Sequence, residues 1–346
     1  MKITKVESLP VDRFLFVKIY TDEGIVGYGE SGAWGFLEPS ASAIDKFGRY
    51  LVGKNPLTIE HHWQYMYRFS HFRGAAIMGA LSALDIALWD IMGKYFGVPV
   101  HQLLGGKTRD RARVYYHVFG STREELIDGV KGAKAEGFTA VGHLTPFLDE
   151  DRELPYFKTH ASKIRDAIDT VGMYRDAVGD SVDLCIEIHR RLTPAEAVVL
   201  ARGIEDFHPY FYEDPILPEN FDAMGLVANN ISVPIATGER LHSIHEFQML
   251  LSRGAVQYVR PDVCLAGGIT HTKKIAAIAE ANYVEVVPHN PLGPVSTAAC
   301  LQIAAAIPNF AIQEYPLGEL EPPKSEIVNK PLVLEEGFLV IPDAPG

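Results

Sequence analysis

VDLCIEIH (residues 182–189), PYFYED (209–214) and VPIATGE (233–239) follow one another in the middle of the chain and decide the fold. Each is a short apolar run that ends in polar residues, and a stretch with helical spacing separates it from the next. Strands that alternate with helices predict a parallel sheet, because parallel strands need a crossover connection. The carboxylates Glu187, Glu213 and Glu239 recur every 26 residues, which places each at the equivalent point of its unit.

The same rhythm extends outward over residues 110–317. Five further strands are expected in ARVYYHV (112–118), TAVGHL (139–144), VQYVRPD (256–262), YVEVVPH (283–289) and FAIQE (310–314). Eight strand-helix units of about 25 residues fit a (β/α)₈-type barrel better than an open doubly wound sheet, which usually has fewer strands. The sequence therefore predicts an α/β fold of the barrel type.

Two flanking regions lack this rhythm. Residues 1–108 open with the strand-like runs MKITKVESLPV and FLFVKIYTDEGIVGYGE and continue with helical spacing at 40–50, 58–67 and 75–96, which indicates an α+β domain. The segment 318–346 contains the hairpin-like run PLVLEEGFLVIP, and we expect it to return to the N-terminal domain. The predicted units are thus the α+β domain 1–108, the barrel 109–317 and the C-terminal segment 318–346.

Composition narrows the function. The 346 residues are 47% hydrophobic, and a chain of this length buries enough surface to be stable without disulfides or a structural metal. The net charge of −12 and the lack of a basic run argue against nucleic acid and anionic membranes as partners. Three widely spaced cysteines, Cys185, Cys264 and Cys300, predict buried thiols in a reducing compartment. No signal peptide is evident, and Asp85 and Asp90 interrupt the longest apolar stretch, so we expect a soluble cytoplasmic protein.

Chemistry is expected where the strands end, because barrel enzymes carry their active sites at the carboxyl ends of their strands. Six consecutive strands end in a carboxylate or an imidazole: Glu187, Glu213, Glu239, Asp262, His289 and Glu314. Three converging carboxylates repel one another and resist burial unless a cation joins them. Oxygen ligands without a CxxC or HxxxH pattern favour Mg²⁺ over Zn²⁺, so one Mg²⁺ per active site is predicted. The alternative is that the three glutamates are separate surface residues.

Two histidines are candidates for acid-base chemistry. His189 lies two positions after Glu187, so alternation along a strand places both side chains on one side. His289 and Asp262 end neighbouring strands, where the carboxylate orients the imidazole and raises its basicity. As alternatives, either histidine is a turn residue, and Glu314 simply accepts a hydrogen bond from a backbone amide.

Several motifs resemble those of a known family. They are ALSALDIALWDIMGKYFGVPVHQLLGG (80–106), YEDP (212–215), ATGER (236–240), RPDVCLAGGIT (260–270) and PHNPLGP (288–294). Together they resemble the mandelate racemase subgroup of the enolase superfamily, and within it the acid-sugar dehydratases, over nearly the whole chain. The resemblance implies a metal bound by Glu187, Glu213 and Glu239, a base formed by His289 with Asp262, and a Glu314 that faces the developing enediolate.

The resemblance also implies the reaction. His189 stands where dehydratases of the D-galactonate and D-mannonate type have a histidine, and VGHLT (141–145) lacks the Lys-x-Lys pair of the racemases and lactonising enzymes. His289 would then remove the C2 proton of an aldonate of galactonate, gluconate or mannonate type. His189 would protonate the leaving 3-hydroxyl, giving a 2-keto-3-deoxy sugar acid. Glu187 departs from the family, which usually has the shorter aspartate. A sugar-acid epimerase on the same site and a catalytically weak sugar-acid sensor remain as alternatives.

The N-terminal domain is expected to cap the barrel and select the substrate, as in this family. Candidate substrate-binding residues are Trp34, His71, Arg73, His143 and Tyr156. Asp214 is expected to support the metal ligands, and Gly267 with Gly268 resembles a phosphate-binding turn, although nothing else indicates phosphate. The expected partners are a small-molecule sugar acid and further copies of the chain in a homo-oligomer.

Overall fold

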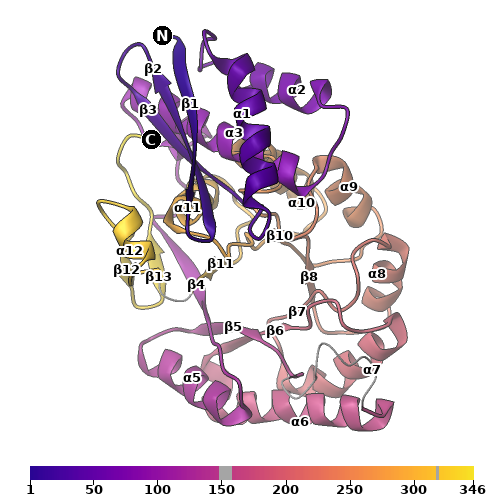
Figure 1. Cartoon of the computed structure of the whole chain (residues 1–346). Helices are drawn as coiled ribbons and strands as arrows, with labels where there is room; N and C mark the ends of the chain where they lie inside the picture. The colour runs from indigo at the N-terminus through magenta and orange to yellow at the C-terminus, as the bar shows by residue number, and fades with distance from the viewer. Residues whose placement is uncertain (148–157, 317–318) are drawn as a thin grey trace.

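The computed structural model describes residues 1–147, 158–316 and 319–346. Tyr156 therefore lies outside the described residues. An α+β domain at the N-terminal end sits against a ring of parallel strands with helices around it (Figure 1). The predicted α/β fold of the barrel type, with an N-terminal α+β domain, is confirmed.

The N-terminal domain is a three-stranded antiparallel sheet covered by helices. The strands β1 (Ile3–Val11), β2 (Phe14–Thr21) and β3 (Val26–Ser31) pair in sequence order. The helices are α1 (Leu37–Leu51), α2 (Ile59–Phe69), α3 (Ala75–Phe96) and the short α4 (Val100–Leu103). The predicted meander and the three long helices are thus present.

Helix α3 lies directly on β3, because glycines on the strand leave room for it. A Cβ added to Gly29 would be 1.9 Å from the carbonyl oxygen of Ala83, so only glycine fits at this contact.

Among the described helices, α3 alone is long and apolar enough to cross a membrane by length and composition. Yet 67% of its most apolar window is buried inside the structure, as expected for a core helix.

The described part of the barrel has eight strands, and a helix connects each strand to the next. Its strands are β4 (Arg111–His117), β5 (Ala140–Leu144), β6 (Asp183–Glu187), β7 (Phe211–Glu213), β8 (Ile235–Thr237), β9 (Tyr258–Val259), β10 (Glu285–Val286) and β11 (Gln313–Tyr315). Neighbours pair in parallel from β4 to β10, and β11 pairs with β4. A parallel bridge between Val286 and Phe310 joins β10 to the segment before β11, so the pairing returns to its start.

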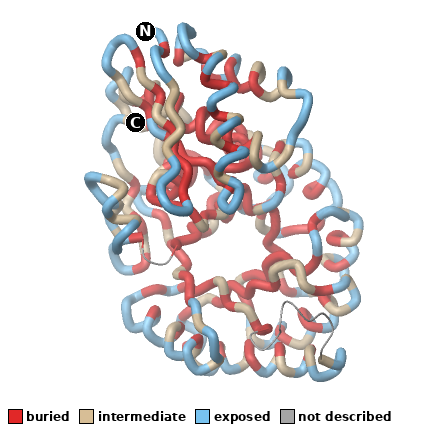
Figure 2. Tube along the Cα trace, viewed as in Figure 1, coloured by how far each residue is buried: buried red, intermediate tan, exposed pale blue. Residues whose placement is uncertain are grey.

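The crossover helices are α5 (Arg123–Ala135), α6 (His160–Val178), α7 (Pro194–Ile204), α8 (Phe221–Ala228), α9 (Ile244–Leu251), α10 (Gly268–Glu280) and α11 (Pro294–Ala306), with short 3₁₀ turns at Gly179–Ser181 and Glu205–Phe207. Most residues of β5 to β8, β11, α3 and α11 are buried (Figure 2). Side chains such as Tyr115, Cys185 and Phe211 are fully buried together between the strands, so the barrel is packed and not a pore. All three cysteines are buried free thiols, as predicted.

The C-terminal segment pairs with the barrel before it reaches the N-terminal domain. After α12 (Lys324–Ile327), the strands β12 (Leu334–Glu335) and β13 (Phe338–Val340) form a hairpin, and β13 pairs antiparallel with β4. Near the C-terminus, Asp343 forms an ion pair with Lys107 at 2.6 Å, and Gly346 forms hydrogen bonds with the backbone of Val98 and Val100. The expected return to the N-terminal domain therefore omitted a strand pairing. The domain boundaries after residues 108 and 317 stay predictions.

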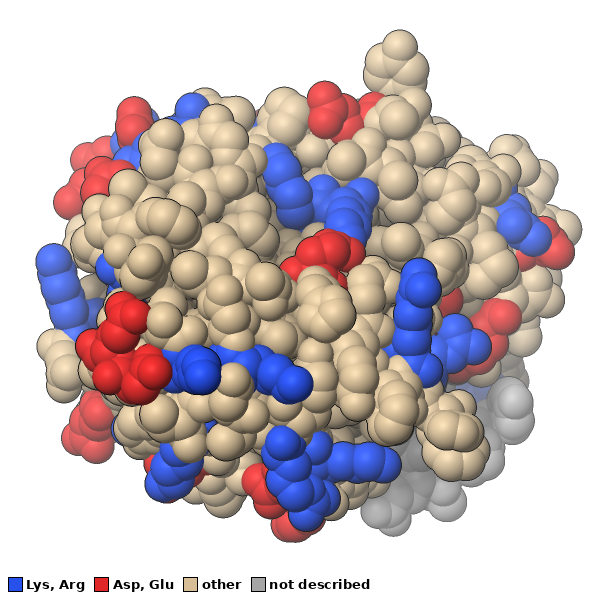
Figure 3. Space-filling view, turned by 90° about the horizontal axis from the view of Figure 1, so that it is seen from above, with Lys and Arg blue, Asp and Glu red and all other residues tan. Residues whose placement is uncertain are grey.

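Basic and acidic side chains are interspersed on the face seen in Figure 3. Some of the basic and acidic side chains form ion pairs on the surface. For example, Nζ of Lys274 lies 2.7 Å from Oε1 of Glu60. This distribution agrees with the lack of a basic run in the sequence. The exclusion of nucleic acid and of a membrane as partners stays a prediction.

Candidate active site

Three glutamates converge at the carboxyl ends of adjacent strands. Glu187 and Glu213 end β6 and β7 and are register partners, while Glu239 lies two residues beyond β8. One carboxylate oxygen from each residue lies within 4.8 Å of the others. Glu187 and Glu213 are each only 3% exposed, so the alternative of three separate surface residues is wrong.

The three glutamates are buried and close together, so their negative charges repel one another, and a bound cation would offset this repulsion. Burial raises the pKa of Glu187 well above its ordinary value, and the charges of Glu213 and Glu239 add to the effect. Burial also raises the pKa of Glu213 to about 8, although Arg260 opposes the shift. Oxygen ligands with like charges, close together and out of water, are what Mg²⁺ binds. The residues present therefore fit the predicted metal.

His289 and Asp262 form the expected pair. The two residues bridge in parallel beyond β9 and β10, and Nδ1 of His289 lies 2.9 Å from Oδ2 of Asp262. Nε2 of His289 lies 3.3 Å from Oε2 of Glu239, so the free side of the ring faces the trio. Burial opposes protonation of His289, but the carboxylates of Glu314, Glu239 and Asp262 outweigh it and raise its pKa to about 9.

His189 also lies beside the trio, but not for the reason that the sequence suggested. Strand β6 ends at Glu187, and His189 has a left-handed backbone with φ 54°, so the alternation of a strand does not apply. Instead a turn brings the residue back: its N–H donates to Oε1 of Glu187 at 2.7 Å, and its Nε2 lies 3.7 Å from Oε2.

Glu314, in β11, is fully buried among donors. It accepts from Nη2 of Arg260 at 2.6 Å and from the N–H of Asn290 at 2.6 Å, and Nε2 of His117 lies 2.8 Å away. The expected backbone amide is therefore one of three partners. Burial would raise the pKa of Glu314, but Arg260 and His289 hold it well below its ordinary value. Glu314 is thus an ionised group with a fixed orientation.

Three site residues were missed by the sequence analysis. Arg260 contacts Glu213, Glu314 and Tyr115, while Arg190 donates to Glu239 and, at 2.7 Å, to Asp214. His117 is the last residue of β4, so the rule applied to later strands would have found it. An arginine inside a buried strand, as in YVRPD (258–262), was the available signal for Arg260.

His143, expected to bind substrate, packs against His189. Their rings meet edge to face with centroids 5.0 Å apart, and Phe119 lies 4.6 Å from His143. Burial and the neighbouring His117 and His189 lower the pKa of His143 to about 3, so this imidazole is neutral. A role in substrate binding stays a prediction.

The other expected substrate residues lie on the outside of the N-terminal domain. Trp34, between β3 and α1, is 55% exposed, and His71 and Arg73, between α2 and α3, are exposed. Nη1 of Arg73 donates to the hydroxyl of Tyr67 at 3.3 Å, within the same domain. Their roles in substrate selection stay predictions.

The turn that contains the glycine pair, at the start of α10, holds a carboxylate of the protein itself. Asp85 of α3 accepts from the N–H of Thr270 at 3.0 Å, and a Cβ on Gly268 would be 2.2 Å from Oδ2 of Asp85. The turn therefore resembles a phosphate site because it holds a carboxylate, and the phosphate interpretation is wrong. Asp214 contacts Arg190 and the hydroxyl of Thr237.

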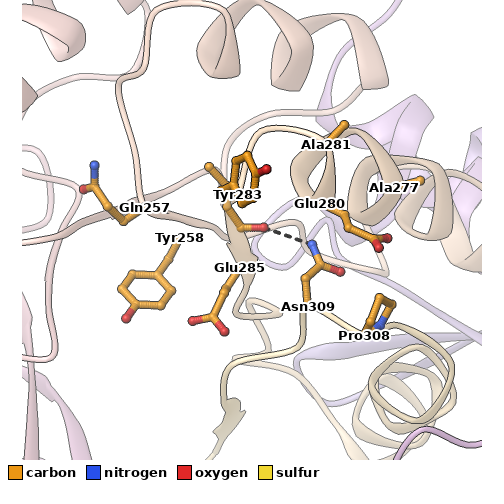
Figure 4. Close-up of a pocket in the computed structure, with 10 residues that line it drawn as sticks. Gln257, Tyr258, Ala277, Glu280, Ala281, Tyr283, Glu285, Pro308 and Asn309 are labelled. Atoms are coloured by element: carbon orange, nitrogen blue, oxygen red, sulfur yellow. Dashed lines mark hydrogen bonds between the residues drawn. The ribbon is translucent and has the colours of Figure 1, made fainter.

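A cavity of about 860 Å³ lies at the opposite ends of the strands (Figure 4). It is lined by residues at the starts of β9 and β10 and at and after the end of α10, among them Tyr258, Glu280, Tyr283 and Glu285. In barrels of this kind, chemistry belongs to the carboxyl ends of the strands. This cavity is therefore separate from the carboxylate trio.

Two family models match the chain. Residues 3–105 match the model described as "Mandelate racemase / muconate lactonizing enzyme, N-terminal domain", and residues 128–346 match "Enolase C-terminal domain-like". Similar curated proteins include the D-galactonate dehydratase of Ralstonia pickettii (strain 12J), 37% identical over 100% of this chain and 91% of the relative. That of Xanthomonas oryzae pv. oryzae (strain PXO99A) is 40% identical over 92% of this chain and 82% of the relative.

Solved structures agree with these matches. A putative dehydratase from Zymomonas mobilis ZM4 is 33% identical and superimposes with a TM-score of 0.93 over 100% of this chain and 94% of that chain. A putative galactarate dehydratase from Agrobacterium radiobacter, described with bound Na and L-malate, is 31% identical with a TM-score of 0.93, covering 100% of this chain and 92% of that chain.

Proposed function

Because the chain belongs to the mandelate racemase and muconate lactonizing enzyme family of the enolase superfamily, we propose that it is a Mg²⁺-dependent sugar-acid dehydratase. The relatives named D-galactonate dehydratase support a hydro-lyase that acts on a sugar acid. Within that class, we propose an aldonate of galactonate, gluconate or mannonate type as the substrate.

One observation carries the proposal: two imidazoles flank the carboxylate trio from different strands. Nε2 of His189 lies 3.7 Å from Glu187, while Nε2 of His289 lies 3.3 Å from Glu239. A dehydration needs a base at C2 and an acid at the 3-hydroxyl, and two positioned groups are a physical basis for both. The far nitrogen of His289, Nδ1, has the carboxylate of Asp262 as its partner, which favours His289 as the base.

Glu187, Glu213 and Glu239 would hold the metal. When bound there, Mg²⁺ supplies positive charge that stabilises the substrate carboxylate and the negative charge that develops on it. The chain's own residues move the protons. The carboxylates around His289 raise its pKa to about 9 without a metal, and a cation bound to Glu239 would offset this effect and favour the neutral imidazole. Nε2 of the neutral His289 takes the C2 proton, and the electron pair of the C–H bond forms the double bond of an enediolate.

The second half of the reaction expels water. His189 donates a proton to the 3-hydroxyl as the C3–O bond breaks, and the enediolate electrons form a C2–C3 double bond. The resulting enol takes up a proton at C3 to give the 2-keto-3-deoxy acid. Glu314, held ionised by Arg260 and His117, stays a fixed anion beside this chemistry.

A screen of sugar acids with four to six carbons tests this proposal. The protein is incubated with each acid and Mg²⁺, and the 2-keto acid product is detected colorimetrically. We expect turnover of at least one aldonate and none after removal of Mg²⁺ with EDTA. In deuterated water, exchange at C2 without a keto product would indicate an epimerase. No reaction with any of the acids would indicate a sugar-acid sensor.

A further inference from the structure

Two barrel helices begin differently from the others. Helices α5 to α9 each start with a residue whose side chain accepts a backbone N–H of the first turn: Thr122, Thr159, Thr193, Asn220 and Ser243. Helices α10 and α11 start instead at Gly267 and Gly293, which have no side chain for this purpose. These two helices follow the loops that carry Asp262 and His289.

The N-terminal domain supplies the missing acceptor to α11. Glu30 lies in β3 and is fully buried. Its Oε1 accepts from the N–H of Gly293 at 2.8 Å, and its Oε2 accepts from the N–H of Ser296 at 2.9 Å. The same loop is bound a second time, because Arg13 of the N-terminal domain donates to the carbonyl oxygen of Pro291 at 3.0 Å.

The same domain supplies an acceptor to α10. Asp85 of α3 is fully buried and binds Thr270 twice, at its N–H (3.0 Å) and at its hydroxyl (2.6 Å). Just before it, the N–H of Gly267 donates to the hydroxyl of Ser82 at 2.9 Å. The indole N–H of Trp63 donates to the carbonyl oxygen of Gly267 at 2.8 Å.

The backbone of Cys264 connects the N-terminal domain directly to Asp262, the partner of the proposed base His289. The carbonyl oxygen of Cys264 accepts from the N–H of Gly32 in the N-terminal domain at 2.8 Å. The N–H of the same residue donates to Oδ1 of Asp262 at 2.8 Å, and Oδ2 of Asp262 binds His289. The loop that carries Asp262 and the loop that carries His289 are therefore both hydrogen-bonded to the N-terminal domain.

Capping a helix with a buried carboxylate from another domain is energetically less favourable than capping it with a local Ser or Thr. A Ser or Thr at the first position would satisfy each helix without burying a charge, as in α5 to α9. Burial of a carboxylate is unfavourable, and it raises the pKa of Glu30 to about 8 and that of Asp85 to about 7. A carboxylate from another domain does what a local cap cannot: it fixes the position of the helix start relative to that domain.

We propose that Glu30 and Asp85 are positioning residues, through which the N-terminal domain fixes the loops that carry His289 and Asp262. This inference rests on the proposed role of His289 as the base. It gives the N-terminal domain a part in catalysis besides substrate selection. It also assigns a task to ALSALDIALWD (80–90) and to the end of GIVGYGE (24–30), two stretches outside the active site.

Glu30→Gln and Asp85→Asn test the inference, with Asp90→Asn as the matched control. Asp90 is also a carboxylate of α3 that binds a backbone N–H, but its partners Tyr28 and Lys94 belong to the N-terminal domain. With D-galactonate and Mg²⁺ as the probe, we expect kcat to fall about 10- to 100-fold in the two variants, because small displacements of a base are costly. KM should stay within about threefold, since the trio is untouched.

A pair of further variants separates positioning from helix capping. Gly293 has an extended backbone, φ −96°, so Gly293→Ser can supply a local cap once Glu30→Ala has made room. We expect the double variant to recover the melting temperature lost in Glu30→Ala but not the lost kcat. Recovery of both would overturn the inference, because Glu30 would then be a cap only. Unchanged kcat in Glu30→Gln and Asp85→Asn would overturn it as well.

Hydrogen exchange provides a readout that needs neither substrate nor metal. In the metal-free protein, the N–H of His289 donates to Pro261 and that of Asn290 to Glu314. Both amides should exchange faster in Glu30→Gln than in the wild type, and at the wild-type rate in Asp90→Asn. Equal exchange in all three would refute the inference even in an active enzyme. If the wild type turns over no sugar acid, the proposed function fails while this comparison still decides the positioning.

Discussion

Nη2 of Arg260 and Oε2 of Glu314 lie 2.6 Å apart, with Arg260 1% and Glu314 4% exposed to solvent. The same guanidinium holds Glu213 through Nε at 2.5 Å and the hydroxyl of Tyr115 through Nη1 at 2.6 Å. One arginine thus joins a proposed metal ligand on β7 to the anion on β11. A lysine could not replace it, because the three partners are contacted by three different nitrogens of the guanidinium, and a lysine has a single nitrogen.

Arg260→Met should strongly destabilise the protein, because it leaves two buried carboxylates without their cation. Removal of one partner from a buried ion pair costs about 3–5 kcal/mol. Arg253→Met is the control: its partner Asp222 is 80% exposed, and a surface pair contributes about 0–1 kcal/mol. Urea denaturation of both variants measures the difference. Equal losses would show that the buried pairs contribute no more than the surface pair.

The metal-free protein should lose stability as the pH rises from about 5 to about 8. Burial raises the folded-state pKa of Glu187 and, to about 8, that of Glu213, whereas the unfolded chain has ordinary carboxyl values. In this pH window these two residues bind more protons in the folded state than in the unfolded state, so their titration favours unfolding as the pH rises. Thermal melts in EDTA at several pH values check this.

Mg²⁺ should reverse that loss. At 100 times its dissociation constant, a ligand of the folded state adds about 2.7 kcal/mol. The gain should be larger near pH 8 than near pH 6, because protons compete with the metal for the same oxygens. Glu239→Gln should abolish most of the gain, and Glu285→Gln, an acidic residue at the start of β10, should keep it. A Glu239→Gln variant that melts like the wild type in Mg²⁺ contradicts the proposed site.

His289→Asn and His189→Asn should fail at different steps. Without the base, both C2 exchange in deuterated water and dehydration should fall, by about 10²–10⁴-fold for one acid-base group. Without the acid, dehydration should fall by a similar factor while C2 exchange continues. NMR of the substrate and the keto-acid assay measure the two rates. His160→Asn, on the exposed face of α6, is the control. Equal loss of exchange in both variants would contradict the separate roles.

The strands and the trio could be predicted from the sequence because both depend on local patterns. Short apolar runs fix the strands, and the interval from Glu187 to Glu213 to Glu239 follows from one repeating unit. The position of His189 could not be predicted in the same way. Its strand ends two residues earlier, and a turn of left-handed backbone brings the imidazole back to Glu187.

The other features could not be predicted from the sequence, because they depend on contacts between residues that are far apart in the chain. Arg260 is a site residue because of partners on β7 and β11, far from it in the sequence. The pairing of β13 with β4 joins the two ends of the barrel sequence, and neither strand indicates the other. The glycines at the start of α10 suggested a phosphate, because the carboxylate that fills the turn comes from Asp85, 185 positions before Thr270.

Gly268→Ala tests that last contact from the barrel side. Gly268 has a left-handed backbone with φ +72°, and an added Cβ would meet Oδ2 of Asp85 at 2.2 Å. Backbone strain and displacement of a buried carboxylate should together cost at least about 2 kcal/mol of folding free energy. Gly132→Ala is the control, since this helical glycine in α5 has open space around it and should gain about 0.5–1 kcal/mol. Urea denaturation measures both changes, and a Gly268→Ala variant as stable as the wild type would show that Asp85 does not occupy this turn.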